Sequence, residues 1–144
     1  MRQPIIKDMD ALQSYNSLHE AKANGAIPWS EEQKMTDTPE WVIYYDKYPV
    51  TEGHLLIVPK WNTDQEIHKC LLQACLMGAD AVLGNIGITG YNIGINMGES
   101  AGQTVMYPHV HLILRRDGDC EDPTGGVRNV IPGKGNYKLW KEEK

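Results

Sequence analysis

One long helical pattern, which begins at Thr63, constrains the fold of this chain most strongly. Thr63 and Glu66 have the spacing of a capping box, in which each side chain bonds a free backbone N–H at the helix start. Apolar residues then recur at helical spacing on one face: Ile67, Leu71, Leu72, Cys75, Leu76, Ala79, Val82 and Leu83. The pattern predicts a helix that ends near Gly84 and buries one face against other structure.

Strand patterns flank this helix on both sides. Before it, Trp41–Tyr45 is aromatic and β-branched, and Gly53–Val58 is a second apolar run beyond a short turn. After it, Tyr91–Asn96 and Pro108–Arg115 have the same character. The order β-β-α-β-β predicts an α+β fold, in which the long helix packs on one face of an antiparallel sheet.

The remaining sequence divides the chain into three parts. These are an N-terminal extension (1–40), a core (41–116) and a C-terminal loop and tail (117–144). In the extension, Asp10–Ala23 has the spacing of a short helix, and Ser30–Thr38 is polar enough to be a loop. The two aromatic residues of Asn136–Trp140 predict a tail that docks on its own subunit or on a neighbour.

Composition excludes several classes of protein. A chain of 144 residues is long enough for one domain with a core, and its net charge of −5 argues against a general nucleic-acid binder. The three cysteines, Cys70, Cys75 and Cys120, include no C-x-x-C pair, so we expect neither a disulfide framework nor a cysteine zinc site. The N-terminus carries early charges and no long apolar segment, which predicts a cytoplasmic protein without signal peptide or membrane anchor.

The strand that begins near Pro108 carries two histidines. His109 and His111 lie two residues apart, so both imidazoles project from the same face of the strand. The loop before them, Gly98–Thr104, is made of small and polar residues. Glycines let such a loop bring backbone N–H groups close to an anion. Together these features predict chemistry on a phosphate.

Two blocks of the chain resemble the histidine triad (HIT) family. Gln103–Arg116 is similar to its signature of Gln-Ser/Thr-Val followed by alternating histidines, and Pro49–Lys60 is similar to its strand with Gly-His and a closing Pro-Lys. Tyr107 stands where the family has the first histidine of the triad, and Leu114 stands where it has a proline. The segment Arg116–Pro132 further resembles a bacterial branch described as diadenosine-tetraphosphate-hydrolase-like.

The resemblance implies a nucleotide hydrolase or transferase of the acid anhydride hydrolase class. Its substrate would be a purine nucleotide conjugate or a dinucleoside polyphosphate, cleaved at the α-phosphate to release a nucleoside monophosphate. His109 would be the nucleophile and form a nucleotidyl-histidine, which water then hydrolyses. This mechanism requires no metal or other cofactor. The family also implies a homodimer whose sheets join, and neither a nucleic-acid nor a membrane partner.

The resemblance assigns the other site residues as well. His111 would contact a phosphate oxygen or help the leaving group depart, Thr104 would donate its hydroxyl, and His54 would stand beside the nucleophile on the neighbouring strand. The substrate contacts it implies are Ile43 at the base, Asp46 at the ribose, Asn96, Gly102 and Gln103 near the phosphates, and Tyr107 in place of the supporting imidazole.

Two other hypotheses fit the same residues. His54, His109 and His111 provide three imidazoles, the number of protein ligands that a catalytic zinc site uses. Alternatively, Tyr107 marks a nucleotide-binding protein that has lost or weakened catalysis, because a phenol does not titrate near neutral pH as imidazole does.

Overall fold

The computed structural model describes residues 15–143. Its α-helices and strands are α2 (Leu18–Ala23), β1 (Lys34–Asp37), β2 (Trp41–Tyr45), β3 (Leu55–Pro59), α3 (Asp64–Gly84), β4 (Gly90–Ile95) and β5 (Val110–Arg115). Short 3-10 helices are η1 (Glu31–Gln33), η2 (Glu99–Ala101), η3 (Gly126–Val130) and η4 (Tyr137–Glu143). Of the helix predicted for Asp10–Ala23, residues 10–14 lie outside the described residues, residues 15–17 are not helical, and Leu18–Ala23 is α2.

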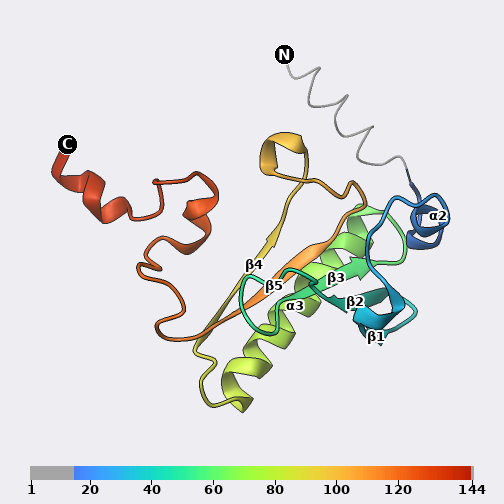
Figure 1. Cartoon of the computed structure of the whole chain (residues 1–144), viewed down its shortest axis with the longest axis horizontal. Helices are drawn as coiled ribbons and strands as arrows, with labels where there is room; N and C mark the ends of the chain where they lie inside the picture. Colours follow the sequence, from blue (N-terminus) through green and yellow to red (C-terminus); the bar gives the residue numbers. More distant parts are fainter. Residues whose placement is uncertain (1–14, 144) are drawn as a thin grey trace.

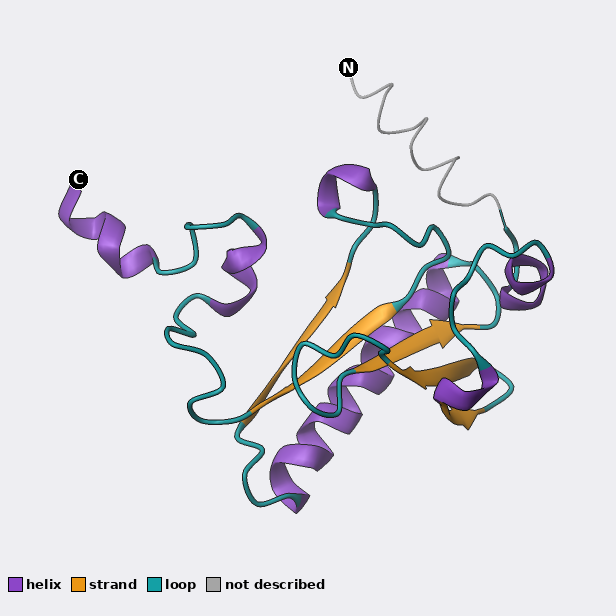
Figure 2. Ribbon diagram, viewed as in Figure 1, coloured by secondary structure: helices purple, strands orange, loops and turns teal. Residues whose placement is uncertain are grey.

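The strands form one antiparallel sheet in the order β1-β2-β3-β5-β4, and α3 lies along one face of it (Figures 1 and 2). Ile43 of β2 pairs with Ile57 of β3, and Leu55 of β3 pairs with Leu112 of β5. This arrangement confirms the predicted α+β fold of a sheet with one long helix. It also brings the segment before β3 beside the middle of β5, although they are far apart in sequence.

The edge strand β1 corrects the prediction that Ser30–Thr38 is a loop. Lys34–Asp37 pairs with β2 and alternates between half-buried and exposed residues. The strand is polar because it lies at the edge of the sheet and buries little of either face. An apolar alternation, the signal that identifies a strand in a sequence, is therefore absent here.

Helix α3 has the predicted bounds but buries a different face. The Thr63 hydroxyl caps it by accepting a hydrogen bond from the Glu66 N–H at 3.3 Å. The residues buried against the sheet are Ile67, Cys70, Ala74 and Gly78, which are mostly small. A side chain at Gly78 would overlap the Tyr91 ring of β4, which lies across the helix at that point.

The predicted apolar face of α3 is therefore wrong in part. Leu72, Leu76 and Leu83 are 61%, 54% and 87% exposed. At 100° per residue they form a stripe on the side of the helix opposite its buried residues. Close approach of the helix to the sheet selects small side chains, and the leucines face away from it.

The two faces of the sheet pack differently. On the α3 side, Ile43, Leu55, Ile57, Val110 and Leu112 form a closed apolar cluster with Cys70 and Ala74. On the other side, Val42, Tyr44, Leu56 and Val58 pack with α2, Trp29 and Tyr107. This second face is covered at the β2 end of the sheet, and the histidines project from the same face nearer to β4.

The segment after β5 leaves the sheet and lies beyond the β4 edge (Figure 1). Its aromatic side chains are covered by cations of the same segment: the Arg128 guanidinium lies 5.5 Å from the Tyr137 ring and 5.3 Å from the Trp140 ring. Lys134 lies 4.5 Å from the Trp140 ring. Among the helices of residues 15–143, none is both long and apolar enough to cross a membrane.

Candidate functional site

A pocket of about 380 Å³ opens on the sheet face opposite α3, and we call it the histidine pocket. Its walls come from the segment before η1, the turn after β2, the loop around η2 and the start of β5. The lining side chains that bear on its chemistry are Trp29, Gln33, Asp46, Asn96, Gln103, Thr104, His109 and His111. The fold therefore brings together most of the residues that the sequence singled out.

His109 is held as a neutral imidazole with one defined tautomer. Its Nδ1 lies 2.9 Å from the backbone carbonyl oxygen of Tyr107, which only accepts hydrogen bonds. Nδ1 therefore carries the proton and Nε2 keeps its lone pair. Burial lowers the pKa of His109 below its ordinary value of 6.5. The Trp29 ring meets the imidazole edge-on at 5.0 Å, which fixes its orientation further.

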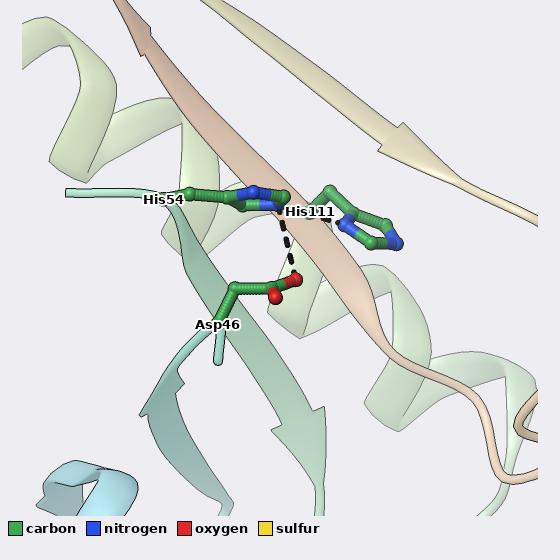
Figure 3. Close-up of side chains that lie close together, drawn as sticks. All are labelled: Asp46, His54 and His111. Atoms are coloured by element: carbon green, nitrogen blue, oxygen red, sulfur yellow. Dashed lines mark hydrogen bonds and ion pairs between the residues drawn. The ribbon is translucent and has the colours of Figure 1, made fainter. Parts of the chain in front are cut away.

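A directed pair of hydrogen bonds links Val50, His54 and His111. Figure 3 shows the two imidazoles of this pair beside Asp46. The Val50 backbone N–H donates to His54 Nδ1 at 3.1 Å, so neutral His54 carries its proton on Nε2. That Nε2–H donates to His111 Nδ1 at 2.9 Å, which leaves the His111 proton on Nε2. The His111 Nε2–H is buried and has no hydrogen-bond partner within the described part of the chain. It is a donor in place for an oxygen of a ligand.

The two linked imidazoles are neutral at physiological pH. Burial lowers the pKa of His111 to about 4, and the neighbouring imidazoles of His109 and His54 act in the same direction. Burial also lowers the pKa of His54, against the opposing effect of the Asp46 carboxylate. His111 is therefore a hydrogen-bond donor near neutral pH and not a cationic acid.

Asp46 serves both the turn after β2 and the pocket. Its Oδ1 accepts a hydrogen bond from the Tyr48 N–H at 2.7 Å, the geometry of an Asx turn. Its Oδ2 lies 3.6 Å from His54 Nε2, and the side chain is 17% exposed. One carboxylate oxygen thus remains directed into the pocket.

The loop around η2 is closed by Gln103. The Gln103 Oε1 accepts from the Gly98 N–H at 2.9 Å, and its Nε2 donates to the Val105 carbonyl at 3.1 Å. Gly98 and Gly102 have φ of +103° and +88°, conformations that favour glycine. Both ends of the Gln103 amide are engaged by the backbone, so this side chain shapes the loop beside Thr104.

Three residues assigned from the sequence do not line the histidine pocket. His54 is connected to it through the hydrogen bond to His111, whereas Ile43 and Tyr107 are buried elsewhere. Ile43 is buried under α3 in the core, because its position in β2 points to the other face of the sheet. Tyr107 is 1% exposed, and its hydroxyl donates to the Pro59 carbonyl at 2.7 Å. Burial raises the pKa of the Tyr107 phenol well above its ordinary value. Only the backbone of residue 107 touches the site, through His109.

Asp46, His54 and His111 also form the one cluster of the described residues with the composition of a metal site. One ligand atom from each lies within 4.8 Å of the others, whereas His109 is not part of the cluster. A metal bound at His54 Nε2 would move the proton of that ring to Nδ1, where it would face the Val50 N–H. The backbone amide therefore opposes metal binding at this cluster.

Trp29 and Gln33 are pocket residues that the sequence reasoning missed. Both lie in the N-terminal extension, before the first strand that the sequence predicts. The adjacent Pro28 and Trp29 were a possible signal, since a tryptophan in a polar stretch needs a partner. Nothing in their spacing indicates that the partner is His109.

Comparison with known proteins adds a family to this geometry. The sequence matches the HIT domain over residues 29–118. An uncharacterized HIT-like protein of Methanocaldococcus jannaschii is 35% identical over 114 residues, which cover 74% of this chain and 85% of that protein. AP-4-A phosphorylase of Mycobacterium tuberculosis is 30% identical over 129 residues, which cover 78% of this chain and 66% of the phosphorylase. A zinc-bound histidine triad family protein of Mycobacterium smegmatis has the same fold, with a TM-score of 0.57 at 23% identity over 86% of this chain and 94% of that one.

Proposed function

The chain belongs to the HIT domain family, and from this premise we propose that it cleaves a purine nucleotide conjugate or a dinucleoside polyphosphate at the α-phosphate. The reaction releases a nucleoside monophosphate through a nucleotidyl-histidine on His109. The observation that carries the proposal is the 2.9 Å hydrogen bond between His109 Nδ1 and the Tyr107 carbonyl. It leaves an unprotonated Nε2 on a residue that lines the pocket.

In the first step, His109 Nε2 attacks the α-phosphorus. The N–P bond forms while the bond from phosphorus to the leaving group breaks, and the leaving group takes the bonding electron pair. The imidazole becomes positively charged, and the Tyr107 carbonyl stabilises this charge through the Nδ1–H. Water then cleaves the N–P bond and regenerates neutral His109.

The surrounding residues seat the nucleotide. The buried Nε2–H of His111 donates to an oxygen of the α-phosphate, and the Thr104 hydroxyl and nearby loop provide further donors. The free oxygen of Asp46 accepts from the ribose hydroxyls, and Trp29 provides an apolar wall for the base. These roles follow the HIT resemblance, with Trp29 in place of Ile43.

Tyr107 takes the position of the first histidine of the triad in this proposal. Its hydroxyl is bonded to Pro59, 48 residues away in sequence, and so ties β3 to the start of β5. The tautomer of His109 depends on the backbone carbonyl of residue 107. The substitution therefore leaves the orientation of the nucleophile intact, which favours an active enzyme over a protein that only binds nucleotide.

The test is incubation with diadenosine tetraphosphate and with aryl esters of AMP, followed by mass spectrometry of acid-free digests. We expect AMP release and an adenylyl adduct on the peptide that contains His109, both absent in His109→Ala. AMP release that persists unchanged in His109→Ala would contradict the mechanism. Binding of AMP without any adduct or turnover would support the nucleotide-binding alternative, and loss of activity on chelation would support the metal alternative.

We also propose that two copies associate at the β4 side of the sheet. In the sheet formed by residues 15–143, β4 is an edge strand, so one row of its backbone groups has no partner strand there. The stripe of Leu72, Leu76 and Leu83 on the outer side of α3 is an exposed apolar surface in the same part of the chain. Pairing of two β4 edges would extend the sheet across two copies, and packing through the outer side of α3 would instead bury the leucine stripe.

A further inference from the structure

A second pocket, of about 560 Å³, lies on the same sheet face as the histidine pocket, and we call it the C-terminal pocket. Its floor is Ile113 and Arg115 of β5, and its outer wall is the segment around η3. Val50, Val127 and Val130 line it and are 71%, 62% and 74% exposed. Three exposed branched side chains around one cavity indicate a site for an apolar ligand.

Two glycines allow the wall around η3 to pack closely. Gly125 and Gly126 have φ of +88° and +48°, conformations that favour glycine. A side chain at Gly125 would overlap the Gly135 carbonyl of the same segment, and one at Gly126 would contact the Asn92 amide of β4 at 3.4 Å. Gly126 therefore lies against β4, next to Val127 in sequence.

The two pockets are neighbours, since His111 and Asn96 line both. Along β5, residues 109, 111 and 113 point to the same face at intervals of about 6.6 Å. His109 lines only the histidine pocket, and Ile113 lines only the C-terminal pocket. In-line attack by His109 places the leaving group on the far side of the phosphorus, in the direction of the C-terminal pocket.

The charged side chains of the C-terminal pocket disfavour the binding of a polyanion. Arg115 is its cation, and the Asp119 carboxylate accepts two hydrogen bonds from the guanidinium, each at 2.7 Å. A third, at 2.8 Å, goes to the Asn92 side chain. Asp122 adds a further negative charge to the lining. A chain of phosphates would meet no free cation among these side chains.

We infer that the C-terminal pocket binds the leaving group of the substrate and that this group is uncharged and apolar, such as an aryl group, in preference to a nucleoside polyphosphate. The inference rests on the proposed function and selects nucleotide conjugates among its substrates. With an aryl ester of AMP, the His109–phosphorus bond forms as the phosphorus–oxygen bond breaks. The aryloxide departs with the electron pair and takes a proton from solvent.

The test compares Val130→Asn with Ile131→Asn, on the 1-naphthyl ester of AMP and on diadenosine tetraphosphate. Asparagine is polar but uncharged, so it removes an apolar contact without repelling a polyphosphate. Ile131 is 59% exposed on the same segment but does not line the pocket, so it is a matched control. We expect Val130→Asn to lower kcat/KM for the naphthyl ester at least tenfold, mainly through KM. Hydrolysis of diadenosine tetraphosphate should change less than threefold, and Ile131→Asn should change neither. Equal effects of the two variants, or equal effects on the two substrates, would overturn the inference.

A binding measurement separates this inference from the proposed function. In His109→Ala, the naphthyl ester should bind at least tenfold more tightly than AMP, and Val130→Asn in that background should remove the difference while AMP affinity stays constant. If His109→Ala retains AMP release but the binding difference holds, the mechanism fails and the pocket assignment stands. If His109→Ala is inactive and the ester binds no better than AMP, the pocket assignment fails and the mechanism stands.

Discussion

The two faces of the sheet differ in the residues that strand β5 contributes to each of them. On β5, Val110 and Leu112 are buried in an entirely apolar cluster under α3. One residue away, His109 and His111 project from the other face, where every imidazole is fixed by hydrogen bonds. Because side chains alternate between the two faces along β5, one residue serves the core and the next serves the site. A substitution should therefore lower either the stability or the activity, depending on which of two neighbouring residues is replaced.

The largest expected effect comes from testing this separation directly at neighbouring residues. His109→Ala should reduce AMP release by about a thousandfold or more, as loss of a nucleophile does. Val110→Ala should instead lower the free energy of unfolding by about 2 kcal/mol, because Val110 is fully buried. Turnover per folded molecule and urea denaturation of both variants measure the two effects. A large loss of turnover in folded Val110→Ala would show that the faces are not independent.

Lowering the pH should reduce the free energy of unfolding through the histidines and leave the contribution of the apolar face unchanged. His111 has a pKa of about 4 when folded and near 6.5 when unfolded, so the unfolded chain takes up the proton first as pH falls. The stability contributed by neutral His111 is complete above pH 6.5 and is lost between pH 6.5 and 4, by on the order of 3 kcal/mol. Urea denaturation across this range measures the slope. His111→Gln should show a smaller slope, and identical slopes would contradict the assignment.

Tyr107 contributes to stability through its side chain and to the site through its backbone, so changing the side chain should affect stability more than turnover. Tyr107→Phe removes the hydrogen bond to the buried Pro59 carbonyl and should cost about 1–2 kcal/mol of stability. AMP release by the folded variant should change less than threefold, since the backbone of residue 107 holds His109. Thermal denaturation and steady-state kinetics test both statements. A hundredfold loss of turnover would show that the phenol itself takes part in the reaction.

The smallest effect on folding should come from the outer side of α3. Leu76 is 54% exposed, so Leu76→Glu should change the stability of a single chain by no more than about 0.5 kcal/mol. If this side joins two copies, the same change should convert dimer to monomer in light scattering. Leu139→Glu, at another exposed leucine, is the control and should leave the mass unchanged. A dimer that survives Leu76→Glu would exclude this surface.

The sequence predicted the elements well and the direction of their side chains less well. Trp41–Tyr45 and the helix after Thr63 have the predicted bounds, because β-branched runs and a capping box are local signals. The resemblance placed Ile43 at the base, and the strand pattern did not contradict it, because every residue of that strand is apolar or aromatic and no alternation shows which face is buried. The buried face of α3 was predicted wrongly in part for a similar reason, since apolar residues occupy both sides of that helix.

The residues of the candidate site also differ in whether a local sequence signal identifies them. The HIT resemblance identified the residues on β5 and in the η2 loop, where the motif is continuous in sequence. Trp29 and the valines of the C-terminal segment come from regions that carry no motif and reach the site only through the fold. The direction of the hydrogen bonds from Val50 to His111 depends on backbone geometry, which no residue pattern encodes.

The direction of the hydrogen bonds from Val50 through His54 to His111 determines which substitutions at residue 50 the site tolerates. The first donor is a main-chain amide, which every amino acid except proline supplies, so nearly all replacements at residue 50 leave the proton order unchanged. A Val50→Pro replacement should release His54 Nδ1, let the ring protonate there, and present Nε2 to a cation beside Asp46 and His111. Zinc titration of that variant against wild type would test this, and equal affinities would refute it. Tighter zinc binding by the variant would show that the backbone geometry at residue 50, and not the identity of its side chain, sets the proton order of these imidazoles.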